Sequence, residues 1–144
     1  MNLDLEIGLR LLLAAGLGAV IGLQRELTGK EAGLRTNMLI SLGSALLTVI
    51  SIYGFAGSDP ARIAAGIATG IGFIGAGVIL HRAGGPVIGL TSAATIWTVA
   101  GIGMAAGAGL YIVSVIATAL SFLILMLPHI DRKNKSKKTD GEIK

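Results

Sequence analysis

The sequence predicts an all-α integral membrane protein with five transmembrane helices packed as a Gly-rich bundle. No Asp, Glu, Lys or Arg occurs in residues 36–58, 63–80 or 83–130. A helix needs only about 20 apolar residues to cross the hydrocarbon core of a bilayer. With 144 residues, 53% of them hydrophobic, and a mean hydropathy of +0.79, the chain has room for one membrane domain.

The five spans are predicted over residues 5–23, 38–55, 63–80, 88–106 and 110–127. Arg10 lies near the outer end of the first span, where its long stem can reach the interface, and Glu6 lies one helical turn before it. The third span is entered through a turn in which Ser58 or Asp59 can cap the helix and Pro60 suits its first position.

The longest uncharged stretch must fold back once, because a single straight helix of that length would exceed the bilayer. Gly107, Ala108 and Gly109 are the weakest helix formers near its middle, so the fourth and fifth spans are separated there. Pro128 is expected to close the last helix.

The charges predict an orientation. Arg25, Lys30, Arg35, Arg82 and the basic tail fall on one side of a five-span layout, whereas Arg10, Arg62, Asp4, Glu6 and Asp59 fall on the other. The positive side is expected to be cytoplasmic, which puts the N-terminus outside. Residues 1–130 then form the transmembrane domain, and residues 131–144 form a basic cytoplasmic tail, predicted to be disordered. This tail suits the anionic leaflet and explains the basic pI without nucleic acid.

Many of the 22 glycines lie four residues from another small residue, a spacing that lets two helix backbones approach closely in lipid. The candidates for helix packing are Gly18 and Gly22 with Ala14, Gly66, Gly70 and Gly72 with Ala68 and Ala76, and Gly103 and Gly107. We therefore expect the first, third and fourth helices to be in close contact, with a homodimer as a further use of these faces. The G-x-G-x-x-G pattern at Gly70 is assigned to packing, since no strand precedes it and no ribose-binding acid follows.

Polar residues gather at the predicted cytoplasmic boundary. The candidate functional network is Arg25, Glu26, Arg35, Thr36, Asn37, Thr91 and Thr95, with the three charged residues forming ion pairs and the others satisfying them. The alternative is that Arg25, Glu26 and Arg82 are anchors solvated at the headgroups. Trp97 is predicted to be a packing residue, and His81 an interfacial polar residue rather than a metal ligand.

Four ordered blocks carry a family resemblance: residues 18–26 (GAVIGLQRE), 32–39 (AGLRTNML), 70–79 (GIGFIGAGVI) and 89–97 (GLTSAATIW). In order and spacing they resemble the membrane domain of the MgtC/SapB family of bacterial inner-membrane proteins. The resemblance implies five spans, signature polar residues at the network positions, and links to magnesium limitation, macrophage survival and restraint of the ATP synthase. Asn37 stands where many relatives have His. The virulence members resemble this domain followed by an ACT-like domain, so the membrane domain alone is expected here.

Two functions stay open. The first is a non-enzymatic protein that modulates magnesium-linked ion or membrane-energy homeostasis by binding another membrane protein, such as the ATP synthase or a transporter. The second is an oligomer that conducts or transports a small ion or solute. Mg²⁺ is usually held through carboxylates, and no acidic residue lies within the four later spans. No nucleophile–base pair or metal cluster can be assembled, so we expect no enzyme, no cofactor and no metal site.

Overall fold

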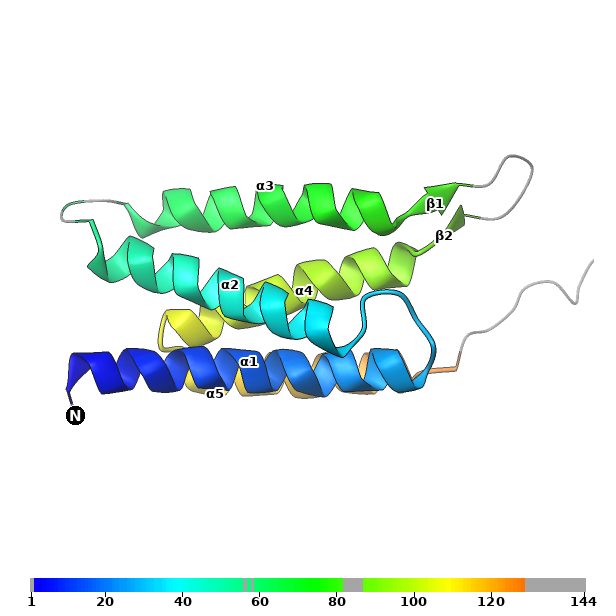
Figure 1. The fold of residues 1–144 in the computed structure, drawn as a ribbon, viewed down its shortest axis with the longest axis horizontal. Helices are drawn as coiled ribbons and strands as arrows, with labels where there is room; N and C mark the ends of the chain where they lie inside the picture. Colours follow the sequence, from blue (N-terminus) through cyan, green and yellow to red (C-terminus); the bar gives the residue numbers. More distant parts are fainter. Residues whose placement is uncertain (1, 56, 58, 82–86, 129–144) are drawn as a thin grey trace, which may run out of the picture.

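The computed structural model describes residues 2–55, 57, 59–81 and 87–128, and in that part five α-helices run along one long axis (Figure 1). They are α1 (Leu3–Leu27), α2 (Leu34–Tyr53), α3 (Pro60–Val78), α4 (Leu90–Gly107) and α5 (Tyr111–Met126). The predicted all-α membrane fold is confirmed, because the first four helices are long and apolar enough to cross a bilayer. The 16 residues of α5 rise about 24 Å, which is less than the roughly 30 Å of a typical hydrocarbon core. Local thinning of the bilayer can accommodate the difference.

Successive helices alternate in direction, so the bundle has two distinct ends (Figure 1). At the end we call the hairpin end, α1, α3 and α5 finish, and α2 and α4 begin. At the opposite, N-terminal end, α1 begins, α2 passes to α3, and α4 turns into α5. Arg25 and Arg35 therefore lie at the same end of the bundle, as a five-span layout requires.

Local chemistry explains where two helices stop or start. Asp59 Oδ1 accepts a hydrogen bond of 2.9 Å from Ala61 N, and Pro60 occupies the first helical position of α3. This confirms Asp59, of the two candidates, as the cap. At the C-terminal end of α5, Leu127 is extended, the conformation that a following proline favours. The helix ends at Met126, as predicted from Pro128.

The α3–α4 connection corrects the predicted spans, which ran to Leu80 and resumed at Ile88. Two short strands, β1 (Leu80–His81) and β2 (Val87–Ile88), pair antiparallel between α3 and α4. Gly89 follows them with φ +91°, and a Cβ there would overlap the carbonyl oxygen of Val78. A residue with a side chain would not fit this close, left-handed turn, so α4 starts at Leu90.

Helix α2 is held between α1 and α4 by closely approaching backbones. A Cβ on Gly18 would lie 2.6 Å from Asn37 O, and one on Gly22 would lie 2.8 Å from Leu34 Cα. From the other side, a Cβ on Gly103 would overlap Ser41 O, and one on Gly107 would lie 2.5 Å from Ala45 O. Gly18 and Gly22 of α1 and Gly103 and Gly107 of α4 are thus packing residues, and their common partner is α2.

Helix α3 corrects the packing prediction. A Cβ on Gly66, Gly70 or Gly72 would meet nothing within 4 Å, so these three glycines do not mediate contacts within the described part of the chain. Instead α3 rests on α4, with Gly75 against Ala93, and it lies on the far side of α2 and α4 from α1 (Figure 1). The predicted close contact of the first and third helices is wrong, because the small, serine-rich α2 takes the place between them.

The main apolar core is built around α4, which α1, α2 and α3 contact from different sides. Ile21, Ile96 and Val99 are fully buried, and Ile67 and Ile71 of α3 pack into the same cluster. A second, smaller cluster of Ala14, Ala45 and Ala106 joins α1, α2 and α4 closer to the N-terminal end. Trp97 is not part of either cluster: it is 58% exposed, which overturns its assignment as a packing residue.

Candidate functional site

Arg25 is the buried charge at the hairpin end. It lies in the last turn of α1, is 4% exposed, and its Nη2 donates to Ser92 Oγ at 2.5 Å. Ser92 lies in the first turn of α4 and donates onward to Glu31 Oε2 at 3.3 Å. An ionisable side chain buried among membrane helices is costly, and such a residue marks a functional site unless its partners are purely structural.

Glu26 has a different role from Arg25, its neighbour. Its Oε2 accepts a hydrogen bond of 2.8 Å from Leu34 N, the first residue of α2. Gly33 offers no side chain to cap α2, and a Cβ there would lie 2.8 Å from the same carboxylate oxygen. The acidic side chain of α1 therefore caps the start of α2, where the helix dipole also favours a negative charge.

Asn37 organises the loop between α1 and α2. It is fully buried, and its Nδ2 donates to Ala32 O at 2.5 Å and to Gly33 O at 2.9 Å. Ala32 has φ 58°, a left-handed conformation that is unfavourable for a residue with a Cβ. The two bonds from Asn37 hold the loop in this shape and bring Glu26 and Leu34 together.

The predicted ion-pair network is not what the structure brings together. Arg35, Thr36 and Thr91 are exposed, and the one ion pair found among the described residues is between Arg10 and Glu6. Thr95 Oγ1 donates to Thr91 O within its own helix, at 2.7 Å. The predicted ion pairs among Arg25, Glu26 and Arg35 are therefore wrong. Arg25 donates to Ser92 instead, and Glu26 accepts from Leu34 N. The functional role of all seven residues stays a prediction.

Two further assignments concern the α3–α4 connection. His81 lies in β1, where its backbone pairs with Val87. Arg82, one of the proposed headgroup anchors, lies outside the described residues, as do the basic residues of the predicted tail. The alternative of solvated headgroup anchors is contradicted for Arg25, which is 4% exposed, whereas Glu26 is exposed and also accepts from Leu34 N.

Sequence reasoning missed a second buried arginine cluster, at the N-terminal end. Arg10 is 7% exposed rather than extended to the interface. Its guanidinium donates to Gly107 O at 3.0 Å, to Tyr111 Oη at 3.1 Å and to Glu6 Oε1 at 2.5 Å, and it lies 5.7 Å from the centre of the Tyr53 ring. The available signal was an arginine inside an apolar run with an acid four residues earlier.

The hairpin end retains unused hydrogen-bonding capacity. Among the described residues, Arg25 Nε, Gln24 Oε1 and Asn37 Oδ1 are buried and have no hydrogen-bond partner. Buried polar atoms of this kind normally bind an ordered water or a small polar group. In the same part of the chain, no three His, Asp or Glu side chains group so that they could hold a metal ion.

A small cavity adjoins this region between α1, α4 and α5. It encloses about 160 Å³ and is lined in part by the hydroxyls of Thr91, Thr95, Thr98 and Ser121. The Thr95, Thr98 and Ser121 hydroxyls donate to carbonyls of their own helices, at 2.7 to 2.9 Å. The rest of the lining is aliphatic (Ile21, Ala94, Val99, Ile124 and Leu125), so the cavity wall is mainly apolar.

Comparisons with known proteins agree on one family. Residues 11–132 match the model of the MgtC family. The chain is 47% identical over 132 residues to "Putative magnesium transporter YhiD" of Escherichia coli K12, covering 86% of this chain and 61% of that protein. It is 44% identical over 141 residues to "Protein SapB" of Bacillus subtilis, covering 91% and 60%.

A third relative, "Protein MgtC" of Brucella abortus, is 45% identical over 108 residues, covering 75% of this chain and 44% of that protein. The chain thus spans about three fifths or less of the length of these relatives. No solved structure matches the chain. The family model covers most of the sequence, and this match agrees with the five-helix membrane fold described above. The chain therefore belongs to the MgtC/SapB family of multi-pass membrane proteins.

Proposed function

We propose that the chain is a non-enzymatic protein of the bacterial inner membrane that modulates magnesium-linked ion or membrane-energy homeostasis by binding another membrane protein. Its hairpin end is cytoplasmic and its N-terminus is outside, because Arg25, Lys30 and Arg35 all belong to the hairpin end. The magnesium link is supported by the name of a relative, the putative magnesium transporter YhiD, and by the link to magnesium limitation that the family resemblance implies.

The observation that carries this proposal is the uncovered small-residue face of α3. Ala68, Gly72 and Ala76 recur at four-residue spacing, Gly72 and Ala76 are exposed, and a Cβ on Gly72 would meet nothing within 4 Å. The equivalent faces of α1 and α4 are already closed against α2. Small residues let helices approach closely in lipid, so this face of α3 suits a helix from outside the chain.

The partner class follows from the same geometry. A backbone-to-backbone contact in the bilayer calls for a transmembrane helix with its own small or shallow face. The family resemblance points to the ATP synthase or an ion transporter, and a homodimer would place a second α3 against the first. The buried arginines take part in neither contact, because their guanidinium groups are bonded within the chain at Ser92 and Gly107.

The test is copurification from native membranes, with mass identification of the proteins that remain bound. Gly72→Leu should fill the uncovered face and remove the partner. Gly101→Leu is the matched control, since Gly101 also has open space around its Cβ but lies on α4. A partner that stays bound to the Gly72→Leu protein, or that leaves both variants alike, would contradict the proposal.

The second candidate function is direct transport of a small ion or solute, which is favoured by the small cavity beside Thr91, Thr95, Thr98 and Ser121. Purified protein in liposomes should show no selective flux if the first function is correct. A saturable or selective flux that is lost in Thr95→Val would support transport instead, since the substitution removes one of the lining hydroxyls while keeping its volume. Thr48→Val is the control, because the Thr48 hydroxyl lies on α2 and bonds Ser44 O.

A further inference from the structure

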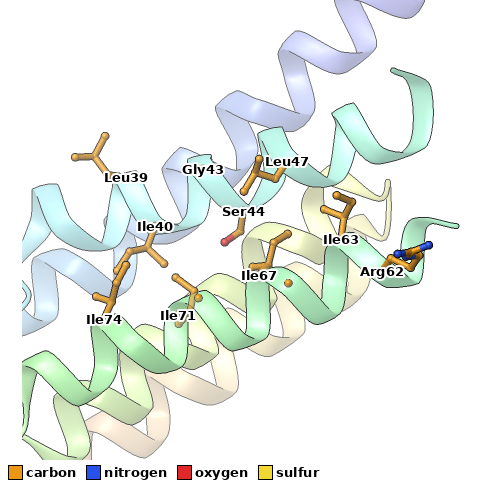
Figure 2. A pocket seen from close by; sticks show the side chains of 12 residues that line it. Leu39, Ile40, Gly43, Ser44, Leu47, Arg62, Ile63, Ile67, Ile71 and Ile74 are labelled. Carbon is orange, nitrogen blue, oxygen red and sulfur yellow. The ribbon is translucent and has the colours of Figure 1, made fainter. Parts of the chain in front are cut away.

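A deep apolar groove runs between α2 and α3, on a side of α3 distinct from its Ala68–Gly72–Ala76 face. It encloses about 520 Å³, and its walls are isoleucines and leucines that face each other across the two helices (Figure 2). Ser44 contributes one hydroxyl, and Arg62 lies at the N-terminal end of the groove. The volume falls within the range of about 300 to 1,000 Å³ that is typical of ligand sites.

Glycines create this space. Gly43 lines the α2 wall and Gly66 and Gly70 line the α3 wall, and a Cβ added to any of them would meet nothing within 4 Å. Because these three positions carry no side chains, the space between the two helices stays open. Because α3 packs chiefly on α4, the groove between α2 and α3 is open along one side, where the bilayer can reach it.

The length and lining of the groove fit a flexible hydrocarbon chain. From Arg62 to Ile74 the groove extends about 18 Å at the α-helical rise, and one leaflet of the hydrocarbon core is about 15 Å deep. The two walls present aliphatic side chains along this length, and a guanidinium stands at one end, which suits an amphiphile with an apolar chain and an anionic head. A single acyl chain matches both the length and the apolar lining.

Arg62 supplies a binding site for the headgroup. It lies in the first turn of α3, next to the membrane boundary, and the single ion pair found in the described part of the chain involves Arg10 rather than Arg62. The nearby Asp59 carboxylate accepts instead from Ala61 N. A guanidinium at the mouth of an apolar groove complements a phosphate whose acyl chain continues into the groove.

We infer that the groove between α2 and α3 binds a phospholipid, with one acyl chain along Gly43, Gly66 and Gly70 and the phosphate at Arg62. An anionic headgroup is preferred, because Arg62 neutralises the single negative charge of phosphatidylglycerol, whereas the ammonium group of a zwitterionic headgroup would remain near the guanidinium and be repelled by it. The site is separate from the α3 face assigned to the partner helix, so each can fail without the other.

Native mass spectrometry of the full chain, purified in detergent and exposed to phosphatidylglycerol or to phosphatidylcholine, tests this inference. The wild-type protein should retain one phospholipid, with about a fivefold preference for phosphatidylglycerol, the contribution of one basic residue near a membrane surface. Arg62→Ala should keep lipid binding and lose the preference. Gly70→Leu should reduce retention at least fivefold, because its side chain fills the groove.

Gly101→Leu is the matched control: it adds the same side chain to an open position on α4, outside the groove and outside the partner face of α3, and should retain lipid as the wild type does. Equal retention by Gly70→Leu and Gly101→Leu would overturn the inference. The inference would also be overturned if the wild-type protein were a dimer that Gly70→Leu dissociated, because a second copy would then be the occupant of the groove. If Gly70→Leu does not fold, Gly43→Leu on the opposite wall and the headgroup preference of Arg62→Ala decide the question.

Discussion

Arg10 Nη1 donates a hydrogen bond of 3.0 Å to the carbonyl oxygen of Gly107, which ties the beginning of α1 to the last residue of α4. At the other end of the same two helices, Arg25 bonds Ser92. The two buried guanidinium groups therefore fix α1 against both ends of α4. The hydrogen bonds of each guanidinium align the two helices and satisfy a charge that would be costly to leave unpaired inside the bilayer.

Arg10→Ala should lower the free energy of unfolding by about 2 to 3 kcal/mol, because it removes three hydrogen bonds that involve a charged group. Unfolding in mixed micelles can be followed by fluorescence of Trp97, the single tryptophan of the chain. Arg35→Ala is the control, since Arg35 is exposed and should change stability by less than about 0.5 kcal/mol. Equal losses would show that the Arg10 contacts do not stabilise the bundle.

Gly103→Ala should destabilise the protein by about 1 to 3 kcal/mol, the usual cost of overpacking. The added methyl group would overlap the backbone carbonyl of Ser41, which cannot move without shifting α2. Gly101→Ala, two residues earlier, has open space and should be neutral or stabilising. The same denaturation assay applies, and a neutral Gly103→Ala would argue against the close approach of α2 and α4.

Ser92→Ala should cost about 1.5 to 3 kcal/mol, since the buried guanidinium of Arg25 would lose its hydrogen-bond partner. Thr91→Ala removes a neighbouring hydroxyl that is exposed, and it should have little effect on stability. Thermal unfolding in detergent would compare the two. If Ser92→Ala is as stable as Thr91→Ala, water must satisfy Arg25 instead.

Glu26→Ala should cost about 1 kcal/mol, the typical value of a helix cap. Glu26→Gln keeps an oxygen that can accept from Leu34 N, and it should recover most of that stability. Hydrogen exchange at the first turn of α2 provides a local measurement, with faster exchange expected for alanine than for glutamine. Identical exchange in both variants would contradict the capping role.

Much of the fold follows from the sequence because hydrophobic length and loop charge act locally. The five helices, the Asp59 cap and the stop at Pro128 depend on short segments that contain their own signals. The glycines of α1 and α4 were also recognised as packing residues. Their partner was not, because the spacing of Gly18 and Gly22 shows that a face is small without showing which helix meets it.

The site was harder to predict for a related reason. Arg25 and Glu26 are adjacent in sequence, yet the helix points them at different partners, Ser92 and Leu34 N. Ser92 lies on a helix far along the chain, and its pairing depends on how α1 and α4 are aligned. Sequence placed these groups at one depth in the bilayer. Only the packing of three helices decides which of them touch.

The position of α2 between the glycines of α1 and those of α4 has a consequence for biogenesis. During synthesis α2 enters the bilayer together with α1, while its second wall is still inside the ribosome or not yet made. Its Ser41 and Ala45 surface therefore stays open to lipid or to the insertion machinery until α4 arrives. A nascent chain halted after α3 would leave Ser41 and Ala45 without the α4 glycines that cover them in the finished bundle.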